Sequence, residues 1–144
     1  MADRLSRSRP TLLPLLAVLA LASCALSACG SATAGASTSP SAVAARFEHA
    51  VSTRDYGAAC RLLTPPTKAD VEKQSGRSCA SSLPSLGLPE QGPSESTRVY
   101  GRAALVTATG ASVFLARSGD TWAVRAAGCT PKAEGPFECA LGGE

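Results

Sequence analysis

The amino-acid sequence predicts an α+β domain in which helices pack on a curved antiparallel sheet of four strands. Apolar residues recur at helical spacing up to about residue 83. After a Pro- and Gly-rich segment over 84–96, short β-branched and aromatic runs alternate with glycines at 101, 110 and 119. The predicted domain also contains four cysteines, two in its helical part and two after the strands begin, and this even number favours two disulfides. A helical block therefore precedes a strand meander along the chain.

The first 28 residues have the layout of an export signal. Arginines at positions 4, 7 and 9 precede an apolar run over 12–26, which is too short for an ordinary spanning helix. Leu26-Ser27-Ala28-Cys29 follows and resembles the motif of bacterial lipoproteins, whose cysteine thiol receives diacylglycerol before cleavage in front of it. This resemblance implies lipidation at Cys29 and anchoring on the outer face of the cell membrane. Two acyl chains anchor a protein in a membrane stably, whereas one chain anchors it only marginally.

A second motif, Leu21-Ala22-Ser23-Cys24, competes with the first. Cleavage before Cys29 discards Cys24 and leaves an even set of cysteines in the domain, whereas cleavage before Cys24 leaves Cys29 as an odd thiol. Parity therefore favours Cys29, with Cys24 and a plain secretory signal as the alternatives.

Residues 29–41 are predicted to be the lipidated cysteine and a disordered tether, because they hold neither charge nor large apolar side chains. Residues 42–144 then form a single domain. Without residues 1–28 the chain has 11 basic and 10 acidic residues, since Asp3 and three arginines are lost. This near-neutral balance offers no basic surface for nucleic acid.

Helix signals begin at Ser39-Pro40, a cap followed by a proline suited to the first turn. One apolar face then contains Val43, Phe47, Ala50 and Val51. Asp55 is predicted to cap a second helix that ends at Thr64-Pro65-Pro66 and carries Tyr56, Ala59, Cys60 and Leu63 on its stripe. Thr67 and Asp70 match a capping box for a third helix closed by Gly76, and Cys79 and Leu83 fall in a further short turn.

Strands are predicted near 96–100, 103–109, 112–117 and 121–127. Alternation places one set of side chains against the helices: Val113, Leu115, Trp122, Val124 and Ala126. The opposite set contains Ser112, Thr121 and Arg125, so the second face of the sheet is predicted to be exposed or concave.

The closing stretch resembles small lipoproteins of high-GC Gram-positive bacteria that look like compact members of the NTF2-like, cystatin-related superfamily. The residues that carry the resemblance are Val99-Tyr100-Gly101, Phe114-Leu115, Trp122-Ala123-Val124, Ala126-Ala127-Gly128-Cys129, Pro131, Pro136 and Cys139. It covers roughly residues 42–142 and implies a cone of helices and curved sheet. Its motifs are turn glycines, core apolars and cysteines, so it supports fold and export far better than function.

The four cysteines of the domain allow three pairings. Local spacing favours Cys60 with Cys79 and Cys129 with Cys139, and a pairing of Cys60 with Cys129 stays open. A zinc site is disfavoured because no paired CxxC motif occurs. No cofactor or metal is expected.

Catalytic patterns are absent from the sequence. His49 is the single histidine and is best explained as a helix-boundary residue within reach of Thr53, while Asp55 and Asp120 are explained by a cap and a turn. We therefore expect a non-catalytic binding module whose partner is an envelope protein or cell-wall component.

The alternative is a small-molecule binder, with Tyr100, Phe114 and Trp122 lining the cone; an enzyme with an unrecognised constellation ranks below both. A cavity of about 300 Å³ or more with convergent polar groups would favour ligand binding, whereas an exposed apolar patch would favour a protein partner.

Overall fold

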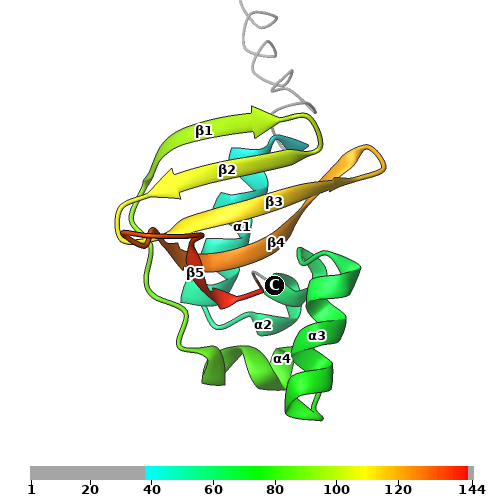
Figure 1. The fold of residues 1–144 in the computed structure, drawn as a ribbon. Coiled ribbons are helices and arrows are strands. Elements are labelled where there is room, and N and C mark those ends of the chain that lie inside the picture. Colours follow the sequence, from blue (N-terminus) through cyan, green and yellow to red (C-terminus); the bar gives the residue numbers. More distant parts are fainter. Residues whose placement is uncertain (1–37, 143–144) are drawn as a thin grey trace, which may run out of the picture. The chain divides into compact units, whose positions relative to one another are not determined.

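The computed structural model describes residues 38–142. The predicted signal peptide over 1–28, both lipidation candidates, Cys24 and Cys29, and most of the tether lie outside these residues. The elements are α1 (Pro40–Ser52), α2 (Tyr56–Arg61), α3 (Pro65–Ser75), α4 (Cys79–Ser82), the 3₁₀ helix η2 (Leu83–Leu86), β1 (Ser94–Tyr100), β2 (Ala103–Ala108), β3 (Ser112–Ser118), β4 (Thr121–Thr130) and β5 (Glu138–Leu141) (Figure 1). In this part of the chain no helix combines the length and apolar character that a membrane crossing requires.

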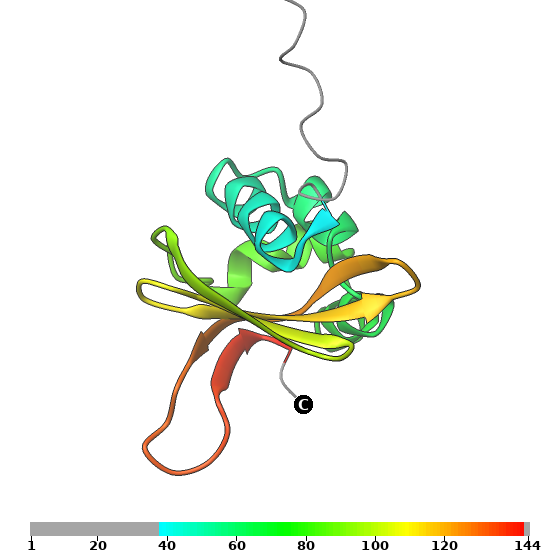
Figure 2. The same ribbon diagram turned by 90° about the horizontal axis from the view of Figure 1, so that it is seen from above.

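The sheet is antiparallel and has five strands in the order β1-β2-β3-β4-β5. The α+β class is confirmed, but the predicted four-stranded meander of an NTF2-like cone has the wrong number of strands, because β5 adds a fifth. β4 extends three residues past its predicted end at 127, and β5 pairs with that extension. The long β4–β5 loop, in orange and red, extends away from the sheet on the side opposite α1 (Figure 2).

The core lies between the helices and one face of the sheet. α1 packs across β1 to β4, and its face of Val43, Phe47 and Ala50 is buried as predicted. The sheet contributes buried side chains from three central strands: Ala104, Val106, Val113, Leu115 and Val124. Leu83, which follows α4 in η2, and Leu141 of β5 close the two ends of the same cluster.

Local capping positions the helices. Ser39 accepts from the backbone N–H of Ala42 at 3.2 Å with Pro40 in the first turn, and Asp55 accepts from Ala58 at 2.9 Å, so both predicted caps are confirmed. Gly76 ends α3 in the left-handed region, also as predicted.

The predicted start of the third helix is wrong. Thr64 is the N-cap, and Pro65 and Pro66 form the first turn of α3 rather than ending α2. Proline is tolerated there because the first N–H groups of a helix have no intrahelical partner. The hydroxyl of Thr67 contacts that of Thr64 at 2.7 Å and donates to the carbonyl of Arg125 at 2.9 Å, so it ties α3 to β4.

A β-bulge at Arg125 changes which side chains of β4 face the helices. Phe114 opposes Ala126 while Leu115 opposes Val124, so Arg125 has no partner on β3. Opposed residues share a face of the sheet. Ala126 therefore joins Phe114 on the face away from the helices, contrary to the predicted alternation, and Ala127 enters the core cluster.

Ser112, predicted on the exposed face, is buried opposite Cys129. Val113, Leu115 and Val124 lie in the core as expected, and Trp122 packs against it while partly buried.

The first half of β4 has a second neighbour besides β3. The segment after α2 pairs with it in parallel: the N–H of Thr64 donates to the carbonyl of Val124, and the N–H of Val124 donates to the carbonyl of Leu62, both at 2.8 Å. This segment occupies the edge that β5, which pairs only from Ala127 onward, leaves open.

Two disulfides, Cys60–Cys79 and Cys129–Cys139, confirm the locally favoured pairing. The first joins α2 to α4. The second joins directly opposed residues of β4 and β5, so it lies within the sheet rather than closing a loop beyond it.

Candidate functional site

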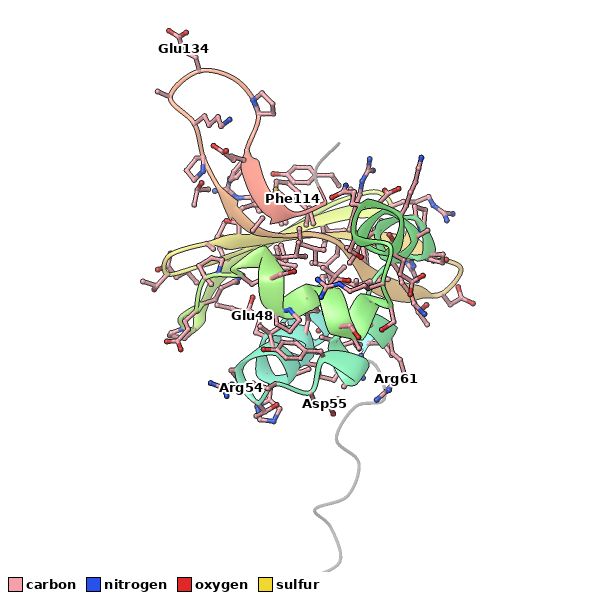
Figure 3. All side chains as sticks on the ribbon, turned by 90° about the horizontal axis from the view of Figure 1, so that it is seen from below. Glu48, Arg54, Asp55, Arg61, Phe114 and Glu134 are labelled. Carbon is pink, nitrogen blue, oxygen red and sulfur yellow. A yellow bond between two sulfur atoms is a disulfide. The ribbon has the colours of Figure 1, made fainter. Side chains whose placement is uncertain are left out.

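A cavity of about 660 Å³ lies between the C-terminal half of α1, the turn that follows it, and the segment 88–94. We call it the α1 cavity. Its polar lining includes Glu48, Arg54, Tyr56, Glu90 and Gln91, and its apolar lining includes Phe47, Val51, Leu88 and Pro89. Figure 3 shows Glu48 and Arg54 on the helical side of the molecule, across the sheet from Phe114.

The amphipathic geometry of α1 sets the position of Glu48. It follows the fully buried Phe47 by one residue, which is about 100° around a helix, and so lies at the border of the buried face. Its side chain is half-buried as a result. This burial raises the pKa of the Glu48 carboxyl from 4.5 to about 7.

The opposite wall of the α1 cavity is fixed to the sheet. The N–H of Gly92 donates to the carbonyl of Thr109 at 3.1 Å. A side chain at position 92 would meet the Thr109 side chain at 2.9 Å, so glycine permits this close approach. The wall that carries Gln91 is therefore held in place before any ligand arrives.

Two polar groups of the α1 cavity are unpaired within the described residues. The Oε1 atom of Gln91 is buried and accepts no hydrogen bond. The carboxyl of Glu48 has neither an ion pair nor a hydrogen bond, since the single ion pair found over 38–142 joins Lys132 to Glu138. Buried polar atoms are normally hydrogen-bonded, so an exception in a cavity indicates a place where a partner can bind.

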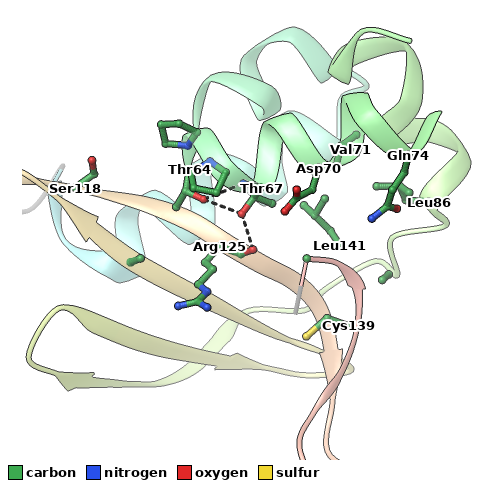
Figure 4. A pocket seen from close by; sticks show the side chains of 15 residues that line it. Thr64, Thr67, Asp70, Val71, Gln74, Leu86, Ser118, Arg125, Cys139 and Leu141 are labelled. Carbon is green, nitrogen blue, oxygen red and sulfur yellow. Dashed lines mark hydrogen bonds between the residues drawn. The ribbon is translucent and has the colours of Figure 1, made fainter. Parts of the chain in front are cut away.

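A second groove, of about 590 Å³, lies between α3 and the β4–β5 end of the sheet (Figure 4). We call it the α3 groove. Its buried hydroxyls, Thr64 and Thr67, already bond to each other and to the Arg125 carbonyl. Its remaining polar side chains, Asp70, Gln74, Ser118 and Arg125, are exposed. The α3 groove thus has no unsatisfied buried group within the described chain, and the α1 cavity is the stronger candidate.

The three aromatic residues predicted to line a ligand site line neither hollow. Tyr100 is 61% exposed on β1, and Phe114 packs edge-on against Phe137 at 5.1 Å on the far face of the sheet. Trp122 lies beneath the guanidinium of Arg117, which is 5.8 Å from its ring centre.

The remaining candidates occupy helix and turn positions. His49 is exposed on α1, and its backbone carbonyl accepts from the hydroxyl of Thr53 at 2.7 Å. Its side chain contributes to the lining of the α1 cavity. Asp120 lies in the turn between β3 and β4, as predicted. Over residues 38–142, no three His, Cys, Asp or Glu side chains are arranged to hold a metal ion.

Sequence reasoning did not select Glu48 or Gln91. Glu48 lies beside the apolar stripe of α1, and the pattern does not reveal which flank of that stripe becomes covered. Gln91 lies in a Pro- and Gly-rich segment that has no periodicity. Only the packing of 88–94 against α1 joins them in one cavity.

Comparison with protein-family models, with curated proteins and with solved structures gives no match to this chain.

Proposed function

We propose that this chain is a lipid-anchored, extracytoplasmic domain that binds a small polar ligand in the α1 cavity and carries out no catalytic step. The lipoprotein-like motif ending at Cys29 supports the location, together with two disulfides of a kind that persists in oxidising compartments. The observation that carries the binding role is that two residues with unpaired polar groups, Gln91 with its buried Oε1 atom and Glu48 with its carboxyl, line the same cavity.

A small ligand is favoured over a protein partner because of how the exposed apolar residues are distributed. Among residues 38–142 the large exposed apolar side chains are Val99 and Tyr100. They are neighbours on β1 and therefore point to opposite faces of the sheet, so they form no continuous patch. The α1 cavity, by contrast, has a volume of about 660 Å³, within the range of about 300–1,000 Å³ that is typical of ligand sites.

The test is a nuclear magnetic resonance screen of the full mature chain against small polyols, amines and carboxylates. We expect amide shifts at 45–56 and 88–94, and none at 65–74, which line the α3 groove. Gln91→Leu removes the unpaired oxygen and should weaken binding about tenfold, while Gln74→Leu, the same change in the α3 groove, should leave it unaltered.

Because Gln91→Leu removes an unsatisfied group, it should not lower stability, so lost binding can be separated from lost folding. Shifts confined to 65–74, or equal effects of the two leucine variants, would contradict the assignment to the α1 cavity.

A further inference from the structure

We propose that the ligand of the α1 cavity carries a protonated primary amine, which donates hydrogen bonds to Gln91 Oε1 and to the carboxylate of Glu48. The inference rests on the proposed function and names the class of its ligand. It stands on the cavity, on two unpaired acceptors that line it, and on the sign of the groups that surround them.

The unpaired polar groups of the residues that line the α1 cavity require a hydrogen-bond donor. Gln91 Oε1 can only accept a hydrogen bond, and an ionised Glu48 can only accept as well. An ammonium group has three donors and no acceptor, so it supplies what both acceptors lack and keeps a donor for water. Hydrogen bonds from a charged donor to a carboxylate are about twice as strong as neutral ones.

The charges of the residues that line the cavity favour a cation beside Glu48. Glu48 and Glu90 are the acidic residues, and Arg54 and His49 are the basic ones. Arg54, His49 and Glu90 are exposed, whereas Glu48 is half-buried, so the charge least screened by water is negative. Arg54 forms no ion pair with either carboxylate, although it shares the cavity with both.

Tyr56 and Leu88 suit the rest of such a ligand. Both are partly buried, pack against the core and line the α1 cavity. An aromatic ring attracts a nearby ammonium through its negative face, and an apolar side chain accommodates the carbon skeleton. An anion would instead meet the Glu48 carboxyl and an unpaired acceptor oxygen, both of which repel it.

Binding of the amine is coupled to loss of the proton from the Glu48 carboxyl. Below about pH 7 the Glu48 carboxyl is mostly protonated, so the amine must select the minor ionised form and the carboxyl proton is released to the buffer. The apparent dissociation constant rises as the competent fraction falls. With a pKa of about 7, that fraction is roughly ten times smaller at pH 6 than at pH 8, which predicts binding about tenfold tighter at pH 8.

The experiment titrates the full mature chain with ethanolamine, whose amine stays protonated between pH 6 and 8, and follows heat and amide shifts. Tetramethylammonium supplies charge without N–H donors, ethylene glycol supplies donors without charge, and acetate is the anionic control. We expect ethanolamine to shift residues 45–56 and 88–94 and to bind at least tenfold tighter than the other three.

Matched variants test which ionisable side chain causes the pH dependence of binding. Glu48→Gln should lose the tenfold dependence on pH and most of the affinity, while Asp70→Asn, which removes a carboxylate from the α3 groove, should retain both. Histidines also change charge in this range, so His49→Gln is included and should retain the pH dependence.

Binding of ethylene glycol or acetate at the same residues in preference to ethanolamine would overturn the amine inference and leave the proposed binding function standing. Equal binding of tetramethylammonium would overturn the hydrogen-bonding assignment. An absence of shifts at 45–56 and 88–94 with every compound would overturn both the inference and the proposed function.

Discussion

Glu48 shows how one helical position decides the protonation of a carboxyl group near neutral pH. It lies one residue beyond the buried Phe47, and its half-burial raises its pKa to about 7. A carboxyl whose pKa is higher in the folded than in the unfolded chain stabilises the fold fully at low pH, and this contribution is lost as pH rises through the folded value.

The chain should therefore lose stability between about pH 4.5 and pH 7 through Glu48. After discounting for solvent screening at a half-buried site, we expect a loss on the order of 1–2 kcal/mol. Glu48→Gln, which cannot ionise, should flatten this part of the curve of unfolding free energy against pH, measured by urea denaturation. Asp70→Asn serves as the control, and an unchanged slope in Glu48→Gln would contradict the assignment.

Gly142 gives a second test at the scale of one residue. Its φ of 68° lies in the left-handed region, and a Cβ there would clash with the carbonyl oxygen of Arg125. Gly142→Ala should cost about 2–4 kcal/mol, from backbone strain and displacement of β5. Gly101 has a similar φ of 59° with open space around it, so Gly101→Ala should cost only about 1 kcal/mol. Equal losses of unfolding free energy would show that the close approach at Gly142 is unimportant.

At the scale of the element, the Phe47 side chain of α1 contributes more to the stability of the core than the Trp122 side chain of the sheet does. Phe47 is 2% exposed in the middle of the core cluster, whereas Trp122 is only partly buried at its border. Phe47→Ala should cost about 3–5 kcal/mol and Trp122→Ala clearly less. His49→Ala, on the exposed side of the same helix, should change unfolding free energy by less than about 0.5 kcal/mol. A larger loss for Trp122→Ala than for Phe47→Ala would contradict the described packing.

Elements governed by local chemistry were predictable from the sequence. The Ser39 and Asp55 caps, the Gly76 stop and the two nearby cysteine pairs depend on residues close together in the chain. The register of β4 was not predictable, because the bulge at Arg125 arises where Thr67 of α3 binds its carbonyl. β5 was missed for a similar reason: it has only four residues and depends on pairing with β4.

The candidate site was unpredictable because its walls come from segments some 40 residues apart. The aromatic residues named from strand spacing proved to be in three different environments. A half-buried carboxyl and an unpaired amide oxygen leave no pattern in a sequence, since both follow from how 88–94 packs on α1.

For the whole molecule, the decisive test concerns its proposed location. Cys29→Ala should block lipidation and processing, moving the domain from the membrane fraction to precursor or secreted forms, as measured by fractionation and acyl labelling. Cys24→Ala is the matched control and should be labelled normally. Labelling lost only in Cys24→Ala would assign the alternative site, and labelling unchanged in both would contradict lipid anchoring.

The pairing of the Leu62–Thr64 segment with β4 bears on whether neighbouring copies of the domain can join through their strand edges. A lipid anchor would confine the domains to a plane, where neighbours meet far more often than in solution, and an open strand edge is a template for joining chains. The segment after α2 occupies one such edge through its two hydrogen bonds to Val124. At the other edge, β1 carries a register shift near Glu95 and the exposed charge of Arg98, features that discourage pairing. The β1 edge and the part of β4 beside Leu62–Thr64 are thus suited to a crowded surface on which neighbouring domains remain separate.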